Sequence, residues 1–435
     1  MASESLRTPG VSEILPLDES ETPPAASARP GMFDSLQDGS YRWFFLSMAS
    51  WFAAMNMSQL VNGFIVFDLT GSYAALGLVS LATAIPMLFL SLPGGVIADR
   101  FPKQRVIQMG QIVNTLVASI LAVLTLLGAL EFVHLMISGA IQGAVFGLII
   151  PSRQTMIADV VSESRLMNGV ALNTAGQNVM RLAAPPVGGL LLTVVGAGWV
   201  FVSMAVLYGI AAFCMLPVRP RPDALTVTRR ARPGERNLGF KDILDGCRYI
   251  WHDKTILLIL ATSCVIVMLS MPIQQMLPGF VKEVLGASGL GLGIIMSVIG
   301  LGSVIGSLLV ANMGGNNRGA WLMAAAVISG ASLLGFALSD MLWLSSIMAV
   351  ILGIGQALRI SISSVLVQTY TEPEYRGRVM SVYMMQFSFV SFGTFFVGVL
   401  AGEIGVQVAL ALTGAALLIF SVVTMVLFPT MRKLA

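Results

Sequence analysis

The strongest constraint on this chain is a series of apolar runs, each long enough to cross a lipid bilayer. A membrane-spanning helix needs roughly 20 consecutive apolar residues, because the hydrocarbon layer is about 30 Å thick. Mean hydropathy is +0.84 over the 435 residues, and only 11% of them are charged. The runs predict an all-α membrane protein with about twelve transmembrane helices. The expected spans are 43–67, 73–98, 104–129, 133–155, 167–195, 197–216, 255–281, 288–313, 319–339, 342–368, 376–402 and 405–428.

Composition excludes several classes of function. A net charge of +3 is too small for a nucleic-acid-binding protein, and three cysteines are too few for a disulfide framework. The two histidines are expected on opposite sides of the membrane, and no nucleophile, base or metal-ligand cluster stands out. A phosphate-binding loop of the Gly-x-x-x-x-Gly-Lys type is also missing from the sequence. We therefore expect neither an enzyme nor a cofactor, and any work that the protein does must draw on gradients.

A polar stretch divides the predicted spans into two equal sets. Residues 1–40 are rich in Pro, Ser and Thr and predict a disordered tail. Residues 41–216 and 255–435 then form two six-helix halves, joined by a linker at 217–254 that is dense in arginine and lysine. Within the linker, residues 240–251 alternate apolar and charged side chains at helical spacing, which predicts an amphipathic helix on the membrane surface.

The distribution of basic residues predicts the orientation of the chain. Cytoplasmic loops carry an excess of lysine and arginine. One set of expected loops carries the linker cations and, in addition, Arg100, Lys103, Arg105, Arg153, Arg165, Arg318, Arg376, Arg378, Arg432 and Lys433. The other set carries Lys282. We therefore expect a multi-pass protein of the cell (inner or plasma) membrane with both termini and the linker in the cytoplasm.

The two halves share a local pattern, which indicates an internal repeat. The link after the fourth span begins Gln154-Thr155, and the link after the tenth begins Gln368-Thr369. Each pair is followed by acidic residues, then arginine, then a helix that begins near a methionine. Duplicated halves of this kind are typical of secondary transporters.

The link between the second and third spans carries the most specific motif. It contains Gly95, Asp99, Arg100, Lys103 and Arg105. This pattern resembles the loop signature of the major facilitator superfamily, with Pro102 at a position where the family has glycine. Segments 67–72, 151–154 and 376–381 are similar to the branch of drug and siderophore exporters that includes the enterobactin exporter and macrolide efflux proteins. The antiporter motif of the fifth span is present at 184–189 without its first glycine.

The resemblance implies the fold and a role for the basic loop. It implies the major facilitator fold, a monomer, and alternating access around a central cavity. The family's loop aspartate, at Asp99 in this chain, docks against the eleventh span and latches the outward-facing state, with Arg376 and Arg378 close by. The alternative is a plain positive-inside anchor. In the second half, the equivalent loop at 314–318 has no acid, so the two halves should be latched unequally.

Polar residues within the spans are the candidates for substrate binding. Asn56, Gln59 and Asn62 follow each other at a spacing of three and form one stripe on the first span. In the family, spans 1, 4, 7 and 10 line the central cavity. On this basis, the further candidates are Gln142, Gln274, Gln275, Gln356 and Arg359. The alternative is that these side chains make hydrogen bonds between helices.

Charged groups within or near the spans carry two further hypotheses. Arg181 and Arg359 lie inside spans, where a charge costs about 2.5–3.5 kcal/mol on insertion scales and needs a partner or a polar cavity. Each either anchors an anionic or carbonyl-rich substrate or bonds to helix carbonyls. Asp68, at the outer end of the first span, is the candidate for proton coupling; the alternative is a loop residue that starts the second span.

Three functions are compatible with these residues. The leading hypothesis is a secondary exporter of amphiphilic small molecules of drug or siderophore type, with protons as a candidate coupling ion. A second is a lipid or lysophospholipid flippase, which needs a cavity open sideways to the bilayer but no buried carboxylate. A third is a membrane sensor that binds a ligand without transporting it. Membrane lipid and a small amphiphile are thus the expected partners.

Overall fold

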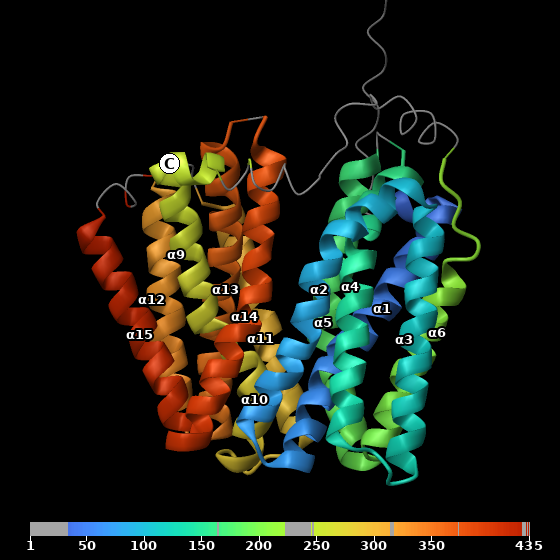
Figure 1. Cartoon of the computed structure of the whole chain (residues 1–435), viewed down its shortest axis with the longest axis horizontal. Helices are drawn as coiled ribbons and strands as arrows, with labels where there is room; N and C mark the ends of the chain where they lie inside the picture. The colour runs from blue at the N-terminus through green and yellow to red at the C-terminus, as the bar shows by residue number, and fades with distance from the viewer. Residues whose placement is uncertain are drawn as a thin grey trace, which may run out of the picture.

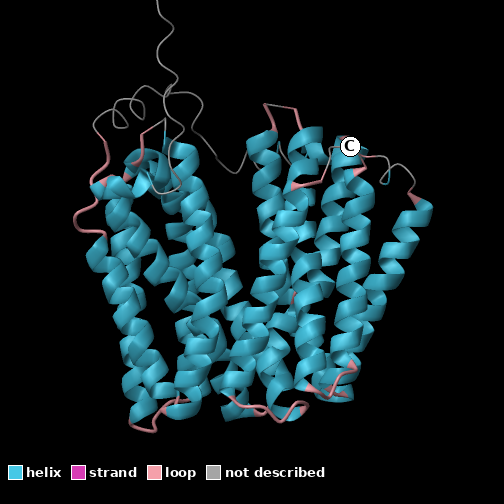
Figure 2. Cartoon of the chain, turned by 180° about the vertical axis from the view of Figure 1, so that it is seen from behind, coloured by secondary structure: helices cyan, strands magenta, loops and turns pink. Residues whose placement is uncertain are grey.

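The computed structural model of this chain describes residues 34–162, 165–221, 245, 248–313, 317–372, 374–428, 432 and 434. Helices run side by side with their long axes nearly parallel (Figure 1), and Figure 2 shows no strand in the described part. The elements are η1 (Asp34–Gln37), α1 (Gly39–Thr70), α2 (Tyr73–Arg100), α3 (Lys103–Leu126), α4 (Phe132–Val160), α5 (Leu166–Val194), α6 (Ala197–Cys214), α9 (Lys254–Ser270), α10 (Pro272–Glu283), α11 (Gly289–Ala311), α12 (Arg318–Ala337), α13 (Leu342–Tyr370), α14 (Arg376–Ile404) and α15 (Val406–Leu427).

The number of membrane crossings agrees with the sequence prediction. Ten helices of the described chain, counting α9 and α10 as one, are long and apolar enough to cross a membrane. Two more, α1 and α5, are as long but carry polar residues along their length and pack tightly against each other and among the rest. Twelve crossings follow. The amphipathic helix expected at 240–251 lies mostly outside the described residues, although Asp245 and residues 248–252 are helical.

Two very short turns, which the expected spans 167–195 and 197–216, and 376–402 and 405–428, imply, are present in the structure. Helices α5 and α6 are separated by Val195 and Gly196 alone, and α14 and α15 by Gly405 alone. The φ angles of Gly196 and Gly405 are +86° and +85°. Glycine adopts positive φ angles without a steric clash, whereas residues with a Cβ do not, so the chain can reverse direction at these two positions without strain.

The seventh span, expected as one helix over 255–281, is interrupted at Met271. Pro272 begins α10 and has no N–H to donate to the carbonyl of Met268, four residues earlier. That carbonyl lies beside Gly393 of α14, where a Cβ would approach it to 2.7 Å. The break therefore follows from a proline that the continuous apolar run concealed.

The apolar core shows how the two halves meet. We call the side where α6 ends and α9 begins the linker side, and the opposite side the outer side. On the outer side, one cluster of buried residues joins both halves, for example Leu60 and Phe201 with Phe280 and Phe336. On the linker side, each half has a separate cluster of its own. The halves are therefore packed together on the outer side and separate toward the linker side, as both views show (Figures 1 and 2).

Three pairs of helices make most of the contact between the halves. They are α2 with α14, α5 with α11, and α1 with α10. Glycines let the backbones touch: a Cβ at Gly77 would lie 2.6 Å from the Cα of Phe395, and one at Gly189 would lie 2.2 Å from the carbonyl oxygen of Gly289. Since these positions lie in the outer halves of their helices, the molecule has a closed outer side.

Candidate functional site

Two glutamines mark where the central helices of the two halves separate. Gly63 of α1 and Pro278 of α10 are in direct contact, because a Cβ at Gly63 would lie 2.7 Å from the Cγ of Pro278. Gln59 and Gln274 each lie four residues, or one turn, to the linker side of this contact. Both side chains are exposed. We infer that both amides face the space between the halves rather than a packed interior.

Behind each exposed glutamine lies a layer of hydrogen-bonded polar groups. In the first half, Asn62 donates to Ser58 over 2.9 Å, and Ser58 donates to the amide oxygen of Gln142 over 3.1 Å. In the second half, Gln274 donates to the amide oxygen of Gln356 over 2.8 Å. The two networks join α1 to α4 and α10 to α13. Predicted residues of spans 1 and 4, and of spans 7 and 10, are thus brought together.

Several amide atoms in these networks have no protein partner. The amide oxygen of Asn62 and the amide nitrogen of Gln356 are buried and make no hydrogen bond with the described residues. Such groups cost free energy unless a water or a ligand satisfies them. Asn56, in contrast, is 6% exposed and donates to the carbonyl of Phe52 on its own helix. Its amide therefore makes a hydrogen bond within α1 and does not face the space between the halves. Gln275 is half-buried.

Arg181 lies where the α5–α11 contact ends. Moving from the outer side inward, this contact passes through Gly293 beside Pro185 and through Ser297, which donates to the carbonyl of Leu182 over 2.7 Å. It then reaches Gly300, where a Cβ would lie 3.3 Å from the Cγ of Arg181. Further along α11, the glycines contact α13 instead of α5. The predicted intramembrane cation is therefore at the level where the two halves part.

The guanidinium of Arg181 is available to a ligand. Its side chain is exposed. Within the described part of the chain, it forms no ion pair or hydrogen bond, and no carboxylate lies in the middle of a span. A cation in this position attracts anions, because the low-dielectric surroundings strengthen the interaction.

Arg359, the other predicted intramembrane cation, is enclosed within the second half. It is 0% exposed, and its three guanidinium nitrogens have no hydrogen-bond partner among the described residues. Ser363 follows Arg359 by one turn of α13, and its hydroxyl lies 2.7 Å from the hydroxyl of Tyr383. Arg359 therefore does not line the space between the halves in this conformation.

Arg153 was expected among the loop cations, and this expectation is wrong. It lies within α4 and is 2% exposed. Its guanidinium packs over the ring of Trp51, 4.2 Å from the centroid, and contacts the sulfur of Met48. The predicted span 133–155 already included Arg153, and its buried face continues to Val160, so Arg153 lies within the helix and not in the loop to which its charge had assigned it.

On the outer side, polar contacts join the halves. Lys282 of α10 forms an ion pair with Asp68 of α1. The hydroxyl of Tyr73 on α2 donates to Glu283 over 2.7 Å. The ion pair is exposed, so it contributes at most about 1 kcal/mol. Asp68 is therefore a link between the halves that is present only while the outer side is closed.

The predicted latch residues lie at the linker-side ends of the helices. Gly95 lies within α2, and the surroundings of Gly95, Asp99 and Arg100 are outside the described part of the structure. Lys103 forms an ion pair with Asp159 of its own half at 2.6 Å. Arg376 donates to the carbonyl of Thr371 over 3.3 Å.

The aromatic environment of Arg378 connects the linker to the second half. The guanidinium of Arg378 lies 5.6 Å from the ring of Tyr375. Tyr249, at the end of the linker, stacks on the same Tyr375, with ring centroids 4.2 Å apart. Among the latch residues, Lys103 and Arg376 are thus held by partners in their own halves, and the latch itself stays a prediction.

Residues 31–434 match the transmembrane secretion effector family, a group of major facilitator transporters. This protein belongs to that family. It is therefore a multi-pass secondary transporter and not an enzyme, as the sequence predicted. The resemblance seen in the loop motif is confirmed at the level of the superfamily.

Two relatives of this transporter are named for the molecules that they move. It is 23% identical over 398 residues to the staphyloferrin A transporter of Staphylococcus aureus, covering 90% of this chain and 96% of that protein. It is also 23% identical over 383 residues to the multidrug efflux pump Tap of Mycolicibacterium fortuitum, covering 85% and 91% of the two chains.

Solved structures show the same fold at low identity. A bacterial homolog of the human lysosomal transporter Spinster, in an inward-facing and unoccupied conformation, matches with a TM-score of 0.69 at 15% identity and covers 90% of this transporter and 98% of that chain. The nucleoside transporter NupG matches with a TM-score of 0.68 at 15% identity and covers 89% and 99%. The two six-helix halves of the major facilitator fold are thereby established.

Proposed function

We propose that this transporter exports amphiphilic small molecules that carry an anionic group, by alternating access between the linker side and the outer side. The observation that carries the proposal is the position of Arg181, an exposed cation without an ion pair among the described residues, at the level where the halves part. Gln59 and Gln274 provide neutral hydrogen-bonding groups nearby, and Asn62 and Gln356 retain unsatisfied amide atoms behind them. The names of two distant relatives, a staphyloferrin A transporter and a multidrug efflux pump, support the transport of small molecules.

The proposed direction of export rests on the charge of the helix ends. At the linker-side ends lie Lys103, Arg105, Arg318, Arg376 and Arg378. Among the described residues, Lys282 is the one lysine or arginine at an outer end. By the positive-inside rule, the linker side is the cytoplasmic side. The described conformation then opens toward the cytoplasm, where an exporter receives its substrate.

Proton antiport is the coupling mechanism that we propose, with Asp68 as the coupling residue. Ionised Asp68 pairs with Lys282 across the closed outer side, whereas protonated Asp68 loses this attraction. Uptake of a proton from the outer side would therefore favour opening of that side. Support for this role is the position of Asp68 on the contact between the halves.

The test follows fluorescent anionic and cationic amphiphiles across liposomes that contain the purified transporter, with and without an imposed pH gradient. We expect gradient-driven movement of the anionic probes, and loss of the gradient effect in Asp68→Asn. Movement that ignores the gradient in both proteins would refute coupling. If the protein bound a probe tightly but moved none of the panel, transport would be refuted and the sensor hypothesis would take its place.

A lipid flippase is the second candidate. It is favoured by Arg181, an exposed cation at the linker-side end of the α5–α11 contact, which could bind an anionic lipid headgroup. In the same liposomes, fluorescent lysophospholipids that cross without a pH gradient, while small amphiphiles do not, would select this function.

A further inference from the structure

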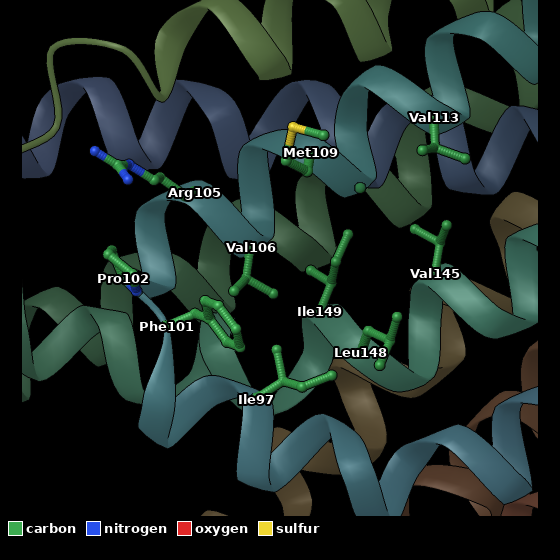
Figure 3. A pocket seen from close by; sticks show the side chains of 11 residues that line it. Ile97, Phe101, Pro102, Arg105, Val106, Met109, Val113, Val145, Leu148 and Ile149 are labelled. Atoms are coloured by element: carbon green, nitrogen blue, oxygen red, sulfur yellow. The ribbon is translucent and has the colours of Figure 1, made fainter.

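An apolar groove lies on the first half, away from the space between the halves. It has a volume of about 360 Å³ and lies between α2 and α3, above α4, with side chains from all three helices pointing into it (Figure 3). The lining residues are Ile97, Phe101, Pro102, Arg105, Val106, Met109, Gly110, Val113, Val145, Leu148 and Ile149. With the exception of Arg105, every lining side chain is apolar.

The groove follows from how α3 packs. Helix α3 packs mainly on α6 and α4, and α4 packs extensively on α2, while α2 and α3 hardly touch. Gly110 brings α3 close to α4, because a Cβ there would lie 2.1 Å from the Cδ1 of Ile149. Helices α2 and α3 therefore stand apart, and α4 forms the bottom of the groove between them. In the second half, α12 packs more closely on α13 than α3 does on α4, so the repeat is asymmetric at this point.

The groove faces the lipid of the linker-side leaflet. Helix α3 makes no substantial contact with the second half in the described part of the chain. The lips of the groove are exposed apolar side chains, with Phe101 at 59% and Met109 at 61% exposure. From Pro102 to Val113 the groove follows α3 for about three turns into the membrane. An apolar groove of this length that opens to the bilayer can hold an acyl chain, because its lining side chains are as apolar as the chain.

A free cation stands at the mouth of the groove. Arg105 lies at its linker-side end, and in Figure 3 its guanidinium extends away from the apolar side chains. Its neighbours are engaged: Lys103 pairs with Asp159 at 2.6 Å, and Gln104 donates to the carbonyl of Met215 over 2.7 Å. Within the described residues, the guanidinium of Arg105 has no hydrogen bond or ion pair. A guanidinium at the membrane surface matches a phosphate in charge and in geometry.

We propose that this groove binds one phospholipid with an anionic headgroup from the linker-side leaflet. One acyl chain lies along α3 over Ile149, and the phosphate contacts Arg105. The lipid is bound and is not transported. The bound chain fills the space between α2 and α3 and so supports α2, the helix that forms a contact with the second half.

The test measures binding of phosphatidylglycerol and phosphatidylcholine, with identical acyl chains, to the purified full-length transporter in detergent by native mass spectrometry. We expect the wild type to prefer phosphatidylglycerol, and Arg105→Gln to reduce that preference at least about fivefold. Val106→Trp, which fills the groove, should weaken both lipids. Arg42→Gln is the matched control, because Arg42 is an exposed cation on the same side and outside the groove.

Two outcomes would overturn the proposal. One is binding of phosphatidylglycerol that is unchanged in both Arg105→Gln and Val106→Trp. The other is dimerisation that Val106→Trp abolishes while lipid binding stays constant, which would assign the groove to a second copy of the chain. If Val106→Trp does not fold, Met109→Trp at the exposed lip fills the same space. Inorganic phosphate is expected not to compete, because it lacks the acyl chain.

Discussion

At the scale of single residues, the arginines of this transporter show how position decides what a charge can do. Arg181, Arg359 and Arg153 all lie within helices that cross the membrane. Arg181 is exposed at the level where the halves part, whereas the other two are at most 2% exposed. The guanidinium of a buried arginine without an ion pair needs water or aromatic rings as its partners inside the protein. An exposed guanidinium can instead bind a ligand.

The first prediction concerns Arg181. We expect Arg181→Gln to reduce transport of anionic amphiphiles about tenfold or more, because a hydrogen bond to a charged group contributes about 1.5–3 kcal/mol. Transport of cationic probes of the same size should change little, and Arg181→Lys should retain part of the anionic activity. The measurement is the initial rate in liposomes at several probe concentrations. Equal losses for both probe charges would mean that Arg181 serves the structure alone.

At the scale of helices, the contacts between the halves are made by glycine. Gly189 faces the carbonyl oxygen of Gly289, and Gly293 faces that of Pro185, where a Cβ would approach to 2.2 Å and 2.5 Å. A backbone oxygen cannot rotate away as a side chain can. The closed outer side therefore depends on small residues at the α5–α11 contact, as close helix packing in membranes generally does.

The second prediction tests this contact. Gly189→Val should force α5 from α11 on the outer side and disfavour the described conformation about 5- to 150-fold, since overpacking costs about 1–3 kcal/mol. Transport should fall while the protein remains folded. Gly402→Ala on α14 is the control, because no atom lies within 4 Å of a Cβ built there. The readout is alkylation of a cysteine at Leu192, which is buried against Gly289 in the described conformation; unchanged accessibility in Gly189→Val would contradict the prediction.

At the scale of the whole molecule, alternating access requires the outer ends of α5 and α11 to separate when their linker-side ends approach each other, and the reverse. The described conformation is closed on the outer side, where a single apolar cluster joins the halves, and separate clusters remain on the linker side. An outward-open state must divide the first cluster and bring the other two together.

The third prediction follows from that reciprocity. Spin labels at Met167 and Leu308 report the linker-side ends of α5 and α11, and labels at Val194 and Ser288 report their outer ends. In a cysteine-free background, we expect pulsed electron paramagnetic resonance to give a short outer distance and a longer linker-side distance. Gly189→Val should lengthen the first and shorten the second. Distances that change in the same sense would refute alternating access about this contact.

Much of the architecture could be predicted from the sequence, because the bilayer imposes simple rules. Span length and turn glycines act locally, so the twelve crossings and the short turns at Gly196 and Gly405 could be predicted. Sequence prediction fails where neighbours matter. Pro272 divides a run that hydropathy treats as continuous, and Arg153 lies inside a helix although its charge suggested a loop.

The sequence by itself determined that this chain is a membrane transporter of two related halves, since apolar length and a loop motif are properties of the chain. Tertiary structure alone decided which polar residues can meet a substrate. From the sequence, the polar stripe on α1 and the arginines on α5 and α13 are equally good candidates for contact with a substrate. Packing of the two halves leaves Gln59, Gln274 and Arg181 exposed and encloses Asn56 and Arg359, because exposure depends on which helix covers each face.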